Sequence, residues 1–366
     1  MDAYRPLPGT KTMDLDTPCL LVDLDALEHN YDVIAATYKD TSTKMRQHTK
    51  NIKSPVLARM QMDTGGTMGG ICAAKVSEAE IMLSAGITDI LIANQVVDRE
   101  KIIRLCALNR HGDVKVCIDS ESNVRDLSGI AQQQGVEIGV LIEVETNMKR
   151  SGVRSTEQGV DLAKVANDLP GVKFLGVMSH QHLEKFIDEE NRILLATEYY
   201  DVCLSVKTAI ENAGIPVHII SSGETFSYDA ALTSGETIEV EGGTYALMGT
   251  MYGYMKEFRI ANKILSTIVS KPSSSIAIAD VGSRALSIVP GGSPTVEDMP
   301  GVIVDQIYDN HIVLKMDGTT SLEVNDKISI LPFYQDMLVN RWDQYIAVRD
   351  GVVEDVWDIL ARGCYH

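Results

Sequence analysis

The sequence predicts a (β/α)8 TIM-type barrel followed by an all-β domain, and three observations carry this prediction. Eight short apolar runs alternate with longer amphipathic segments in the first two thirds of the chain. Each run is nearly continuous in apolar residues, as is typical of parallel strands covered on both faces by helices. After about residue 256, apolar runs instead alternate with turn signals such as MDG and RDG, which favours hairpins. A doubly wound sheet is the alternative for the first region.

The elements follow from these patterns in chain order. The predicted barrel strands are 45–48, 70–74, 89–94, 115–120, 139–144, 173–179, 218–223 and 238–245. Seven helices are predicted between them, and several begin with Ser, Thr or Asp and end at Gly. One of these helices begins in SSGETFSYDAA, after the seventh strand. The N-terminal stretch TPCLLVDLDALEHN gives a further strand and helix, and we expect this strand to pair with the C-terminal domain. The barrel is therefore placed at 28–255, and 1–27 with 256–366 form the β-rich domain.

Composition argues against several classes of partner. The chain has 51 acidic and 33 basic residues, a net charge of -18, whereas nucleic acid and anionic membranes require basic surface. Its six cysteines are scattered without CxxC spacing, which favours reduced thiols. No apolar segment is long enough to span a bilayer and the first residues lack a signal-peptide core, so a cytoplasmic location is expected.

Unusual residues gather where the predicted strands end, which is where barrels of this type carry their chemistry. In this acidic chain the stretch MRQHTKNIKSP concentrates Arg46, His48, Lys50 and Lys53 at the first strand end. The last two strands end in SSG and GGTY, and loops at these positions in barrels often bind phosphate through backbone N–H groups. A lysine and a phosphate site on one rim are the two anchors of pyridoxal phosphate, a Schiff base and a phosphate cradle. The alternative is that these residues are ordinary polar loops.

These motifs resemble fold-type III pyridoxal-phosphate enzymes, the alanine racemase fold, and within it the D-threonine aldolase and D-serine dehydratase branch. RQHTKNIK is similar to that branch's opening motif, Arg-Pro-His-x-Lys-x-His-Lys. Further similar stretches follow in order over nearly the whole chain: GGICAAKVSEAEIM, DILIANQVV, IEVETNMKRSGV, SSGETFSYD, EVEGGTYALM, DVGSRALS and VRDGVVEDVWDILARG. The resemblance implies a homodimer that acts on a small amino acid, with Lys50 as the Schiff-base lysine.

Strand ends and resemblance together give the candidate site. Lys50 is the predicted catalytic lysine. His180 and His182 follow the sixth strand and are candidate acid–base groups, with His182 the better match to the branch. If the strand continues through them, we expect the two to point to opposite sides, so that only one faces the cofactor. Besides Lys50, the predicted cofactor contacts are His48, Arg150 near the ring oxygen, a phosphate set, and Tyr245 packing nearby. The predicted phosphate contacts are Ser222, Gly223, Thr225, Gly243 and Thr244.

Two departures from the branch bear on metal binding. Ile52 stands where the second histidine of the opening motif is expected. The branch carries a metal-binding histidine in its C-terminal domain, and here the sequence PFYQD places Tyr334 at that position and keeps only Asp336. A phenol is a poor neutral ligand for Mn, Mg or Zn, and one carboxylate holds such an ion weakly. Tyr334 is then a candidate catalytic group. A metal bound by His180, His182 and Asp336 is an alternative.

Three reactions fit such a site. Retro-aldol cleavage of a D-configured β-hydroxy-α-amino acid, such as D-threonine or 3-hydroxyaspartate, is favoured because it requires only deprotonation. Dehydration of D-serine or 3-hydroxyaspartate suffers most from a missing metal, since hydroxide leaves poorly without a Lewis acid. Racemisation is third. A non-catalytic cofactor carrier, which the C-terminal domain argues against, and a barrel that uses Lys50 without this cofactor are the remaining alternatives.

Overall fold

The computed structural model describes residues 4–182 and 189–366, which form two compact units. The barrel unit consists of Ile34–Lys50, Pro55–Gly243 and Gly363–His366. The β-rich unit consists of the N-terminal segment up to Val33, the short segment Asn51–Ser54, and Thr244–Arg362. Each unit is therefore assembled from segments that lie far apart in the sequence.

The barrel unit is a closed parallel barrel, as predicted, and not a doubly wound sheet. Its strands are β2 (Lys44–His48), β3 (Thr67–Ala73), β4 (Asp89–Gln95), β5 (Asp113–Ile118), β6 (Ile138–Glu143), β7 (Val172–Ser179), β8 (Ile219–Ser222) and β9 (Glu239–Val240). The two-residue strand β9 pairs with both β8 and β2, which closes the barrel. Apolar side chains, Cys72, Leu91, Cys117, Leu141 and Met178 among them, pack together as one buried cluster of this unit.

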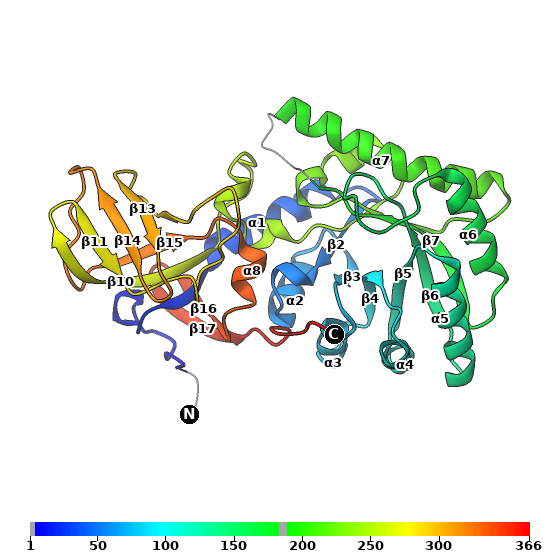
Figure 1. The fold of residues 1–366 in the computed structure, drawn as a ribbon, viewed down its shortest axis with the longest axis horizontal. Helices are drawn as coiled ribbons and strands as arrows, with labels where there is room; N and C mark the ends of the chain where they lie inside the picture. The colour runs from blue at the N-terminus through cyan, green and yellow to red at the C-terminus, as the bar shows by residue number, and fades with distance from the viewer. Residues whose placement is uncertain (1–3, 183–188) are drawn as a thin grey trace. The chain divides into compact units, whose positions relative to one another are not determined.

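Helices lie outside the strands of the barrel (Figure 1). They are α2 (Pro55–Thr64), α3 (Val76–Ser84), α4 (Arg99–Leu108), α5 (Glu121–Gln134), α6 (Thr156–Asp168) and α7 (Glu189–Asn212). Local sequence sets their ends. Asp98 caps α4 by accepting hydrogen bonds from the N–H groups of Glu100 and Lys101, and α5 ends at Gly135 in the left-handed conformation.

The helix predicted after the seventh barrel strand is wrong. Between β8 and β9 the chain forms two short 3-10 helices, Thr225–Ser227 and Ala230–Thr233. Here side chains bond to nearby backbone N–H groups: Ser227 accepts from Glu224 N at 3.0 Å and Asp229 accepts from Ala230 N at 3.0 Å. Such local bonds compete with the hydrogen bonds of an α-helix, so the segment turns instead.

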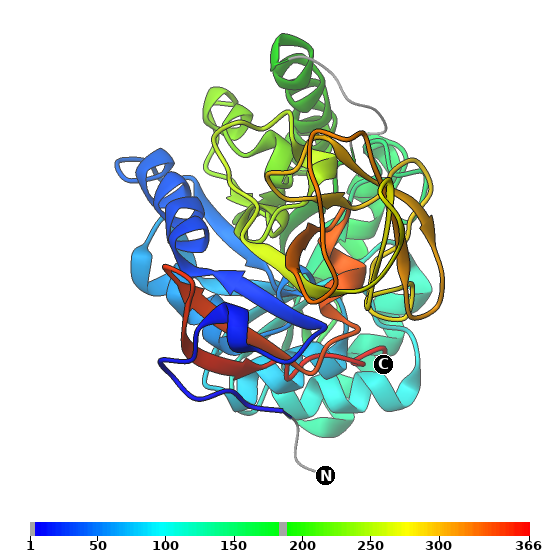
Figure 2. The ribbon, with the colours of Figure 1, turned by 90° about the vertical axis from the view of Figure 1, so that its left-hand side faces the viewer.

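The β-rich unit is built around the N-terminal strand β1 (Cys19–Asp23). The other strands are β10 (Asn262–Ser273), β11 (Ile276–Ala279), β12 (Thr295–Val296), β13 (Val302–Ile307), β14 (Ile312–Met316), β15 (Lys327–Leu331), β16 (Gln344–Arg349) and β17 (Val352–Asp358). The strand order is β13-β14-β11-β10-β1-β16-β17, and β15 pairs with β10 and β12. β1 runs antiparallel to β10 and parallel to β16, so the predicted pairing of the N-terminal strand is confirmed (Figure 2). Helix α1 (Leu24–Thr37) follows β1, and the short α8 (Gln335–Val339) precedes β16.

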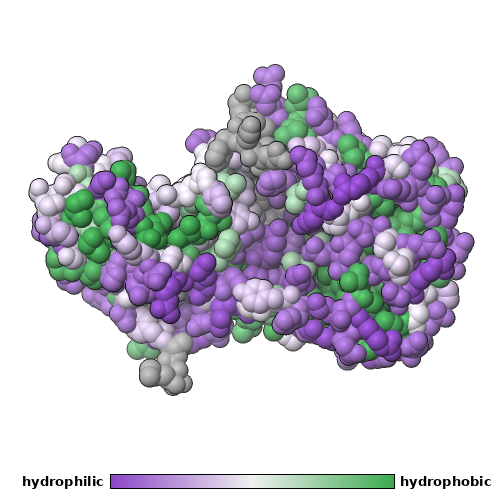
Figure 3. Space-filling view, viewed as in Figure 1, coloured by the Kyte–Doolittle hydropathy of each residue, from purple (hydrophilic) through white to green (hydrophobic). Residues whose placement is uncertain are grey.

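The surface in view differs between the units. Hydrophilic residues dominate the face of the barrel unit, whereas apolar residues gather on the face of the β-rich unit (Figure 3). Exposed apolar side chains of the β-rich unit include Val269, Ile303 and Tyr308. Among the residues that the structure describes, no helix combines the length and the apolar character that crossing a membrane requires.

Candidate active site

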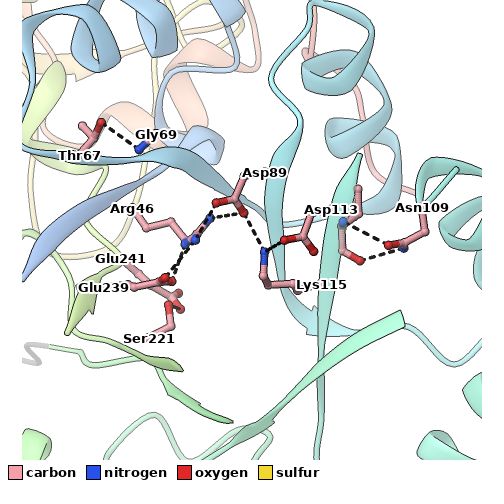
Figure 4. Close-up of polar contacts among 11 residues, drawn as sticks. Arg46, Thr67, Gly69, Asp89, Asn109, Asp113, Lys115, Ser221, Glu239 and Glu241 are labelled. Atoms are coloured by element: carbon pink, nitrogen blue, oxygen red, sulfur yellow. Dashed lines mark hydrogen bonds and ion pairs between the residues drawn. The ribbon is translucent and has the colours of Figure 1, made fainter. Parts of the chain in front are cut away.

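Arg46, the first of the basic residues that end β2, belongs to an ion network inside the barrel. Its side chain is 1% exposed and donates to Glu239 Oε2 at 2.6 Å and to Asp89 Oδ1 at 3.0 Å. Asp89 also accepts from Lys115 Nζ at 2.9 Å (Figure 4). Burial disfavours the Arg46 charge, but the two carboxylates outweigh it and raise the pKa of Arg46. Because Asp89 and Glu239 open β4 and β9, the network lies at the N-terminal end of the barrel, away from the rim expected to carry chemistry.

Lys50 lies on the opposite rim, two residues beyond β2. It sits in a 3-10 turn (Thr49–Asn51) and is half-buried. The backbone N–H of His48 donates to Gly242 O at 2.8 Å, which ties the end of β2 to the loop after β9. The His48 ring is buried, and its Nδ1 accepts from the Lys50 backbone N–H at 3.4 Å. The lysine is therefore held at the mouth of the barrel by a short, anchored turn.

His180, just beyond β7, joins His48 at this mouth. The two rings lie nearly parallel, 6.1 Å apart between centroids with 19° between their planes. His180 Nε2 faces the carbonyl oxygen of Ala93 at 3.1 Å, and Nδ1 lies 3.7 Å from Glu241 Oε2. Burial lowers the pKa of His180 to about 3, and the nearby charges of Lys50 and Arg150 act in the same direction. His180 is therefore a neutral imidazole over the physiological range of pH.

Glu241 is a site residue that the sequence analysis missed. Its side chain is fully buried, and Ser221 Oγ donates to Oε1 at 2.7 Å. Burial raises the pKa of Glu241 to about 7, against the lowering effects of the Ser221 bond and of Arg46. The available signal was an acidic residue inside the run IEVEGG, which breaks the apolar pattern of a buried strand end.

The loop after β6 carries Arg150. Arg150 Nη2 lies 3.4 Å from Oε1 of the buried Glu143, and Ser151 Oγ donates to Glu143 Oε2 at 2.9 Å. The same loop holds the chain after β7: Thr146 Oγ1 donates to His180 O at 2.5 Å, and the Asn147 amide bonds to both backbone groups of His182. Glu143 and Asn147 thus fix the rim, and the sequence analysis named neither.

His182 is brought to a different environment from His180. It is exposed, and only its backbone is anchored by Asn147 in the described part of the chain. The structure therefore groups His180 with His48 and Lys50, and leaves His182 exposed on the rim just beyond them. The expectation that strand alternation separates the two histidines does not apply, because β7 ends at Ser179, before both of them, and residues two apart in a strand lie on the same face.

The predicted phosphate loops follow β8 and β9. Ser222 Oγ lies 2.6 Å from Ser179 Oγ. Gly223 has a φ of +96°, and a Cβ there would lie 2.1 Å from Tyr200 Oη, so this position requires glycine. Thr225 is buried directly after it, and Gly243 follows β9 at the same end of the barrel. Ser222, Gly223, Thr225 and Gly243 therefore gather at the C-terminal ends of β8 and β9.

The remaining candidates belong to the β-rich unit. Thr244 Oγ1 accepts from Asn51 Nδ2 at 3.3 Å. Tyr245 is fully buried, with its ring 6.2 Å from that of Tyr31 and 6.1 Å from that of Phe258. Tyr245 is thus a core residue of this unit.

Asp336 is surrounded by hydrogen-bond donors. Tyr334 Oη donates to Oδ2 at 2.8 Å, and Gln335 Nε2 donates to Oδ1 at 3.0 Å, where Asn51 Nδ2 donates as well. A divalent cation needs lone pairs directed at it, and three donors already directed at one carboxylate do not suit it. Among the described residues there is no group of three His, Cys, Asp or Glu side chains that could hold a metal. The residues around Asp336 therefore do not fit a metal site.

Family models match nearly all of this architecture. Residues 22–246 match the alanine racemase N-terminal domain, and residues 261–348 match a putative serine dehydratase domain. A 3-hydroxy-D-aspartate aldolase of Paracoccus denitrificans (strain Pd 1222) is 35% identical, over 98% of this chain and 95% of that protein. A D-threonine aldolase of an Arthrobacter species is 33% identical, over 97% of this chain and 95% of that protein.

More distant relatives show the same fold. The crystal structure of D-threonine aldolase from Filomicrobium marinum superposes with a TM-score of 0.93 at 32% identity, over 99% of this chain and all of that one. A D-threo-3-hydroxyaspartate dehydratase of Delftia sp. (strain HT23) is 26% identical over 95% of this chain and 98% of that protein. Relatives on this fold thus include both aldolases and a dehydratase.

Proposed function

The chain belongs to the alanine racemase N-terminal domain family, and on this premise we propose that it is a pyridoxal-phosphate-dependent lyase. Its proposed reaction is cleavage of a D-configured β-hydroxy-α-amino acid to glycine and an aldehyde. The observation that carries the proposal is Lys50, half-buried at the mouth of a closed barrel and beside the neutral ring of His180. The relatives at 35% and 33% identity are aldolases and the dehydratase is at 26%, which supports cleavage over dehydration.

The barrel-unit residues fit the cofactor that the family implies. Lys50 supplies an amine at the rim, and Gly223, with a φ of +96°, leaves the backbone of the loop after β8 without a side chain. Ser222, Thr225 and Gly243 lie with Gly223 at the C-terminal ends of β8 and β9, where loop N–H groups of such barrels bind phosphate. We propose that Lys50 holds the cofactor covalently, that Ser222, Gly223, Thr225 and Gly243 hold its phosphate, and that Arg150 lies at its ring oxygen. When bound, the cofactor spreads the negative charge of a Cα carbanion over its ring.

Cleavage needs a base for the β-hydroxyl proton. The base removes this proton, the C–O bond becomes a carbonyl, and the Cα–Cβ electron pair remains on Cα, which is then protonated to give glycine. Both ring nitrogens of His180 face protein groups, Ala93 O and Glu241 Oε2, so His180 is not placed to take a substrate proton. His182 is exposed on the same rim with its backbone fixed by Asn147, and we propose it as the base.

Identification of the products tests the proposal. Cofactor-loaded protein is offered D-threonine, D-3-hydroxyaspartate, D-serine and D-alanine, with the L-enantiomers as matched controls, in the presence and absence of a chelator. We expect glycine with acetaldehyde from D-threonine and glycine with glyoxylate from D-3-hydroxyaspartate, in equal amounts with and without chelator. A keto acid and ammonia that disappear on chelation would instead identify a dehydratase, the second candidate, which the match of residues 261–348 to a serine dehydratase domain favours.

We also propose that the protein is a homodimer. The proposal rests on the family resemblance, and the exposed apolar side chains Val269, Ile303 and Tyr308 on the β-rich unit support it. Sedimentation velocity at several protein concentrations tests it. A single species at the monomer mass of 40.1 kDa would reject the proposal.

A further inference from the structure

Glu241 is buried in the barrel, and only one of its two carboxyl oxygens has a hydrogen-bond partner among the described residues. Ser221 Oγ donates to Oε1 at 2.7 Å, and Figure 4 shows the two side chains together. Oε2 has no hydrogen-bond partner in the described residues, although the side chain is fully buried. An ionised carboxylate with an unpaired buried oxygen is costly, so this oxygen needs either a donor or a proton of its own.

The group that faces Oε2 is Nδ1 of His180, at 3.7 Å. The other ring nitrogen, Nε2, faces a backbone carbonyl at 3.1 Å, and a carbonyl oxygen can only accept. The proton of the neutral ring is therefore on Nε2, and Nδ1 presents a lone pair to the carboxyl. Two acceptors that face each other repel unless one proton lies between them. Hydrogen bonds in unliganded sites are often long, so 3.7 Å is compatible with a contact that tightens when the site is filled.

The charges around the pair decide where that proton resides. The charge of Arg46 lowers the pKa of Glu241, and the charges of Glu143 and Glu239 raise it. Glu241 in turn raises the pKa of the nearby thiols, which are Cys72, Cys117 and Cys203. Lys50 and Arg150 act on His180 and disfavour a charged ring. Burial raises the pKa of Glu241 to about 7 and lowers that of His180 to about 3, so the carboxyl is the better holder of the proton.

We propose that Glu241 is a positioning residue whose carboxyl carries a proton on Oε2, directs it at Nδ1 of His180, and so fixes that ring as the Nε2–H tautomer beside Lys50. The pair then places no net charge at the rim. An ionised Glu241 would instead put a negative charge in the barrel interior. The effect of that charge on a bound cofactor rests on the proposed function, whereas the tautomer and the proton do not.

Glu241→Gln is the informative variant. Its amide oxygen can accept from Ser221 and its NH2 group can donate to Nδ1, so it reproduces the protonated carboxyl at the same size. Glu241→Ala removes both contacts. Glu121→Gln is the matched control, because it removes one negative charge from the exposed start of α5 and touches neither ring.

The first readout is the state of the His180 ring in the full-length, cofactor-loaded protein. Nitrogen-15 spectra of labelled histidine distinguish the two neutral tautomers and the imidazolium, and loss of one signal in His180→Asn assigns it among the eight histidines. We expect the Nε2–H tautomer in the wild type at about pH 6 to 7, unchanged in Glu241→Gln and in Glu121→Gln, and perturbed in Glu241→Ala. An imidazolium, or an Nδ1–H ring, in the wild type would overturn the proposal.

The second readout is the pH dependence of the bound cofactor's absorption band. We expect the wild type and Glu121→Gln to show a transition near pH 7 that Glu241→Gln lacks. In the amino-acid assay, Glu241→Gln should retain activity whereas Glu241→Ala loses about tenfold or more, the factor expected for a lost buried hydrogen bond. A Gln variant as impaired as the Ala variant, with an altered His180 signal, would show that the ionised carboxylate is required. If no amino acid is cleaved, the proposed function fails. The nitrogen-15 spectra of His180 then still test whether Glu241 fixes the ring as the Nε2–H tautomer.

Discussion

Lys50 is distinguished from other lysines of the barrel rim by its surroundings. It is half-buried in an anchored turn beside His48, whereas Lys75, at the end of β3, is exposed. We expect Lys50→Ala to lose the cofactor absorption band and to lower kcat on the order of 10³-fold or more, because it removes the amine that we propose as the covalent anchor of the cofactor. Lys75→Ala is the control and should leave both unchanged. A Lys50→Ala protein that keeps the band after dialysis would contradict the assignment.

Glu241 makes the stability of the protein depend on pH in a direction set by its burial. Its pKa is raised from its usual value of 4.5 to about 7, so between these values the folded chain keeps a proton that the unfolded chain releases. The free energy of unfolding therefore falls as pH rises through this window, by up to roughly 3 kcal/mol. His180 acts oppositely: its pKa is lowered from 6.5 to about 3, so its contribution rises with pH between those values.

Glu241→Gln should remove the first of these two dependences and keep the second. Relative to wild type, the variant is then expected to gain unfolding free energy as the pH is raised from about 5 to about 8. Urea denaturation at several pH values measures this difference. A difference that stays constant with pH would mean that Glu241 has the same pKa in the folded and unfolded chain.

Sequence reasoning found some site residues and missed others for a physical reason. Lys50, His48 and His180 were predicted because each lies at or just beyond the end of a predicted strand, and parallel strands bring their ends to one rim. Glu241 and Glu143 were missed because their roles depend on partners from other strands. Ser221 comes from β8, Arg150 from the loop after β6, and no local pattern pairs these with a given carboxylate.

At the scale of elements, the ion network of the barrel interior links three strands. Arg46 from β2 bonds to Asp89 of β4 and to Glu239 of β9, and the bond to Glu239 is the buried one, because the Asp89 side chain is 34% exposed. We expect Arg46→Ala to cost about 3–5 kcal/mol of unfolding free energy, because it leaves the Glu239 carboxylate buried without its partner. Arg125→Ala, which breaks an exposed pair with Glu121 on α5, should cost about 0.5 kcal/mol or less. Chemical denaturation of both variants provides the comparison, and equal small losses would show that the network is not structurally important.

The same scale shows where element prediction succeeds. Barrel strands were predicted within a few residues because buried parallel strands have continuous apolar runs, and helices such as α4 were predicted from their caps. The connection between β8 and β9 was mistaken for a helix because Ser, Thr and Asp residues that resemble an N-cap instead bond within successive turns. The last barrel strand was predicted over 238–245, whereas β9 has only two residues. Its length is set by how far it pairs with β2 and β8, which its own sequence does not show.

At the scale of the whole molecule, the β-rich unit depends on residues from the start of the chain. β1 lies between β10 and β16 in the sheet, so without it the path β13-β14-β11-β10 is separated from β16-β17. Leu15, Cys19 and Leu21 also pack in one buried cluster with Leu265, Ile346, Val348 and Val353. The C-terminal segment therefore lacks both a central strand and part of its core when it is made alone.

We accordingly expect a fragment of residues 244–362 to show no cooperative unfolding, because unpaired inner edges and an open core are exposed to water. The same fragment joined to residues 4–33 by a flexible linker should recover β-sheet circular dichroism and a cooperative transition. A matched control carries the joined segment with Leu21→Asp, which places a charge in the shared core at the centre of β1. If the fragment folds cooperatively by itself, or if the Asp control folds as well as its parent, β1 is an accessory strand and not the centre of the unit.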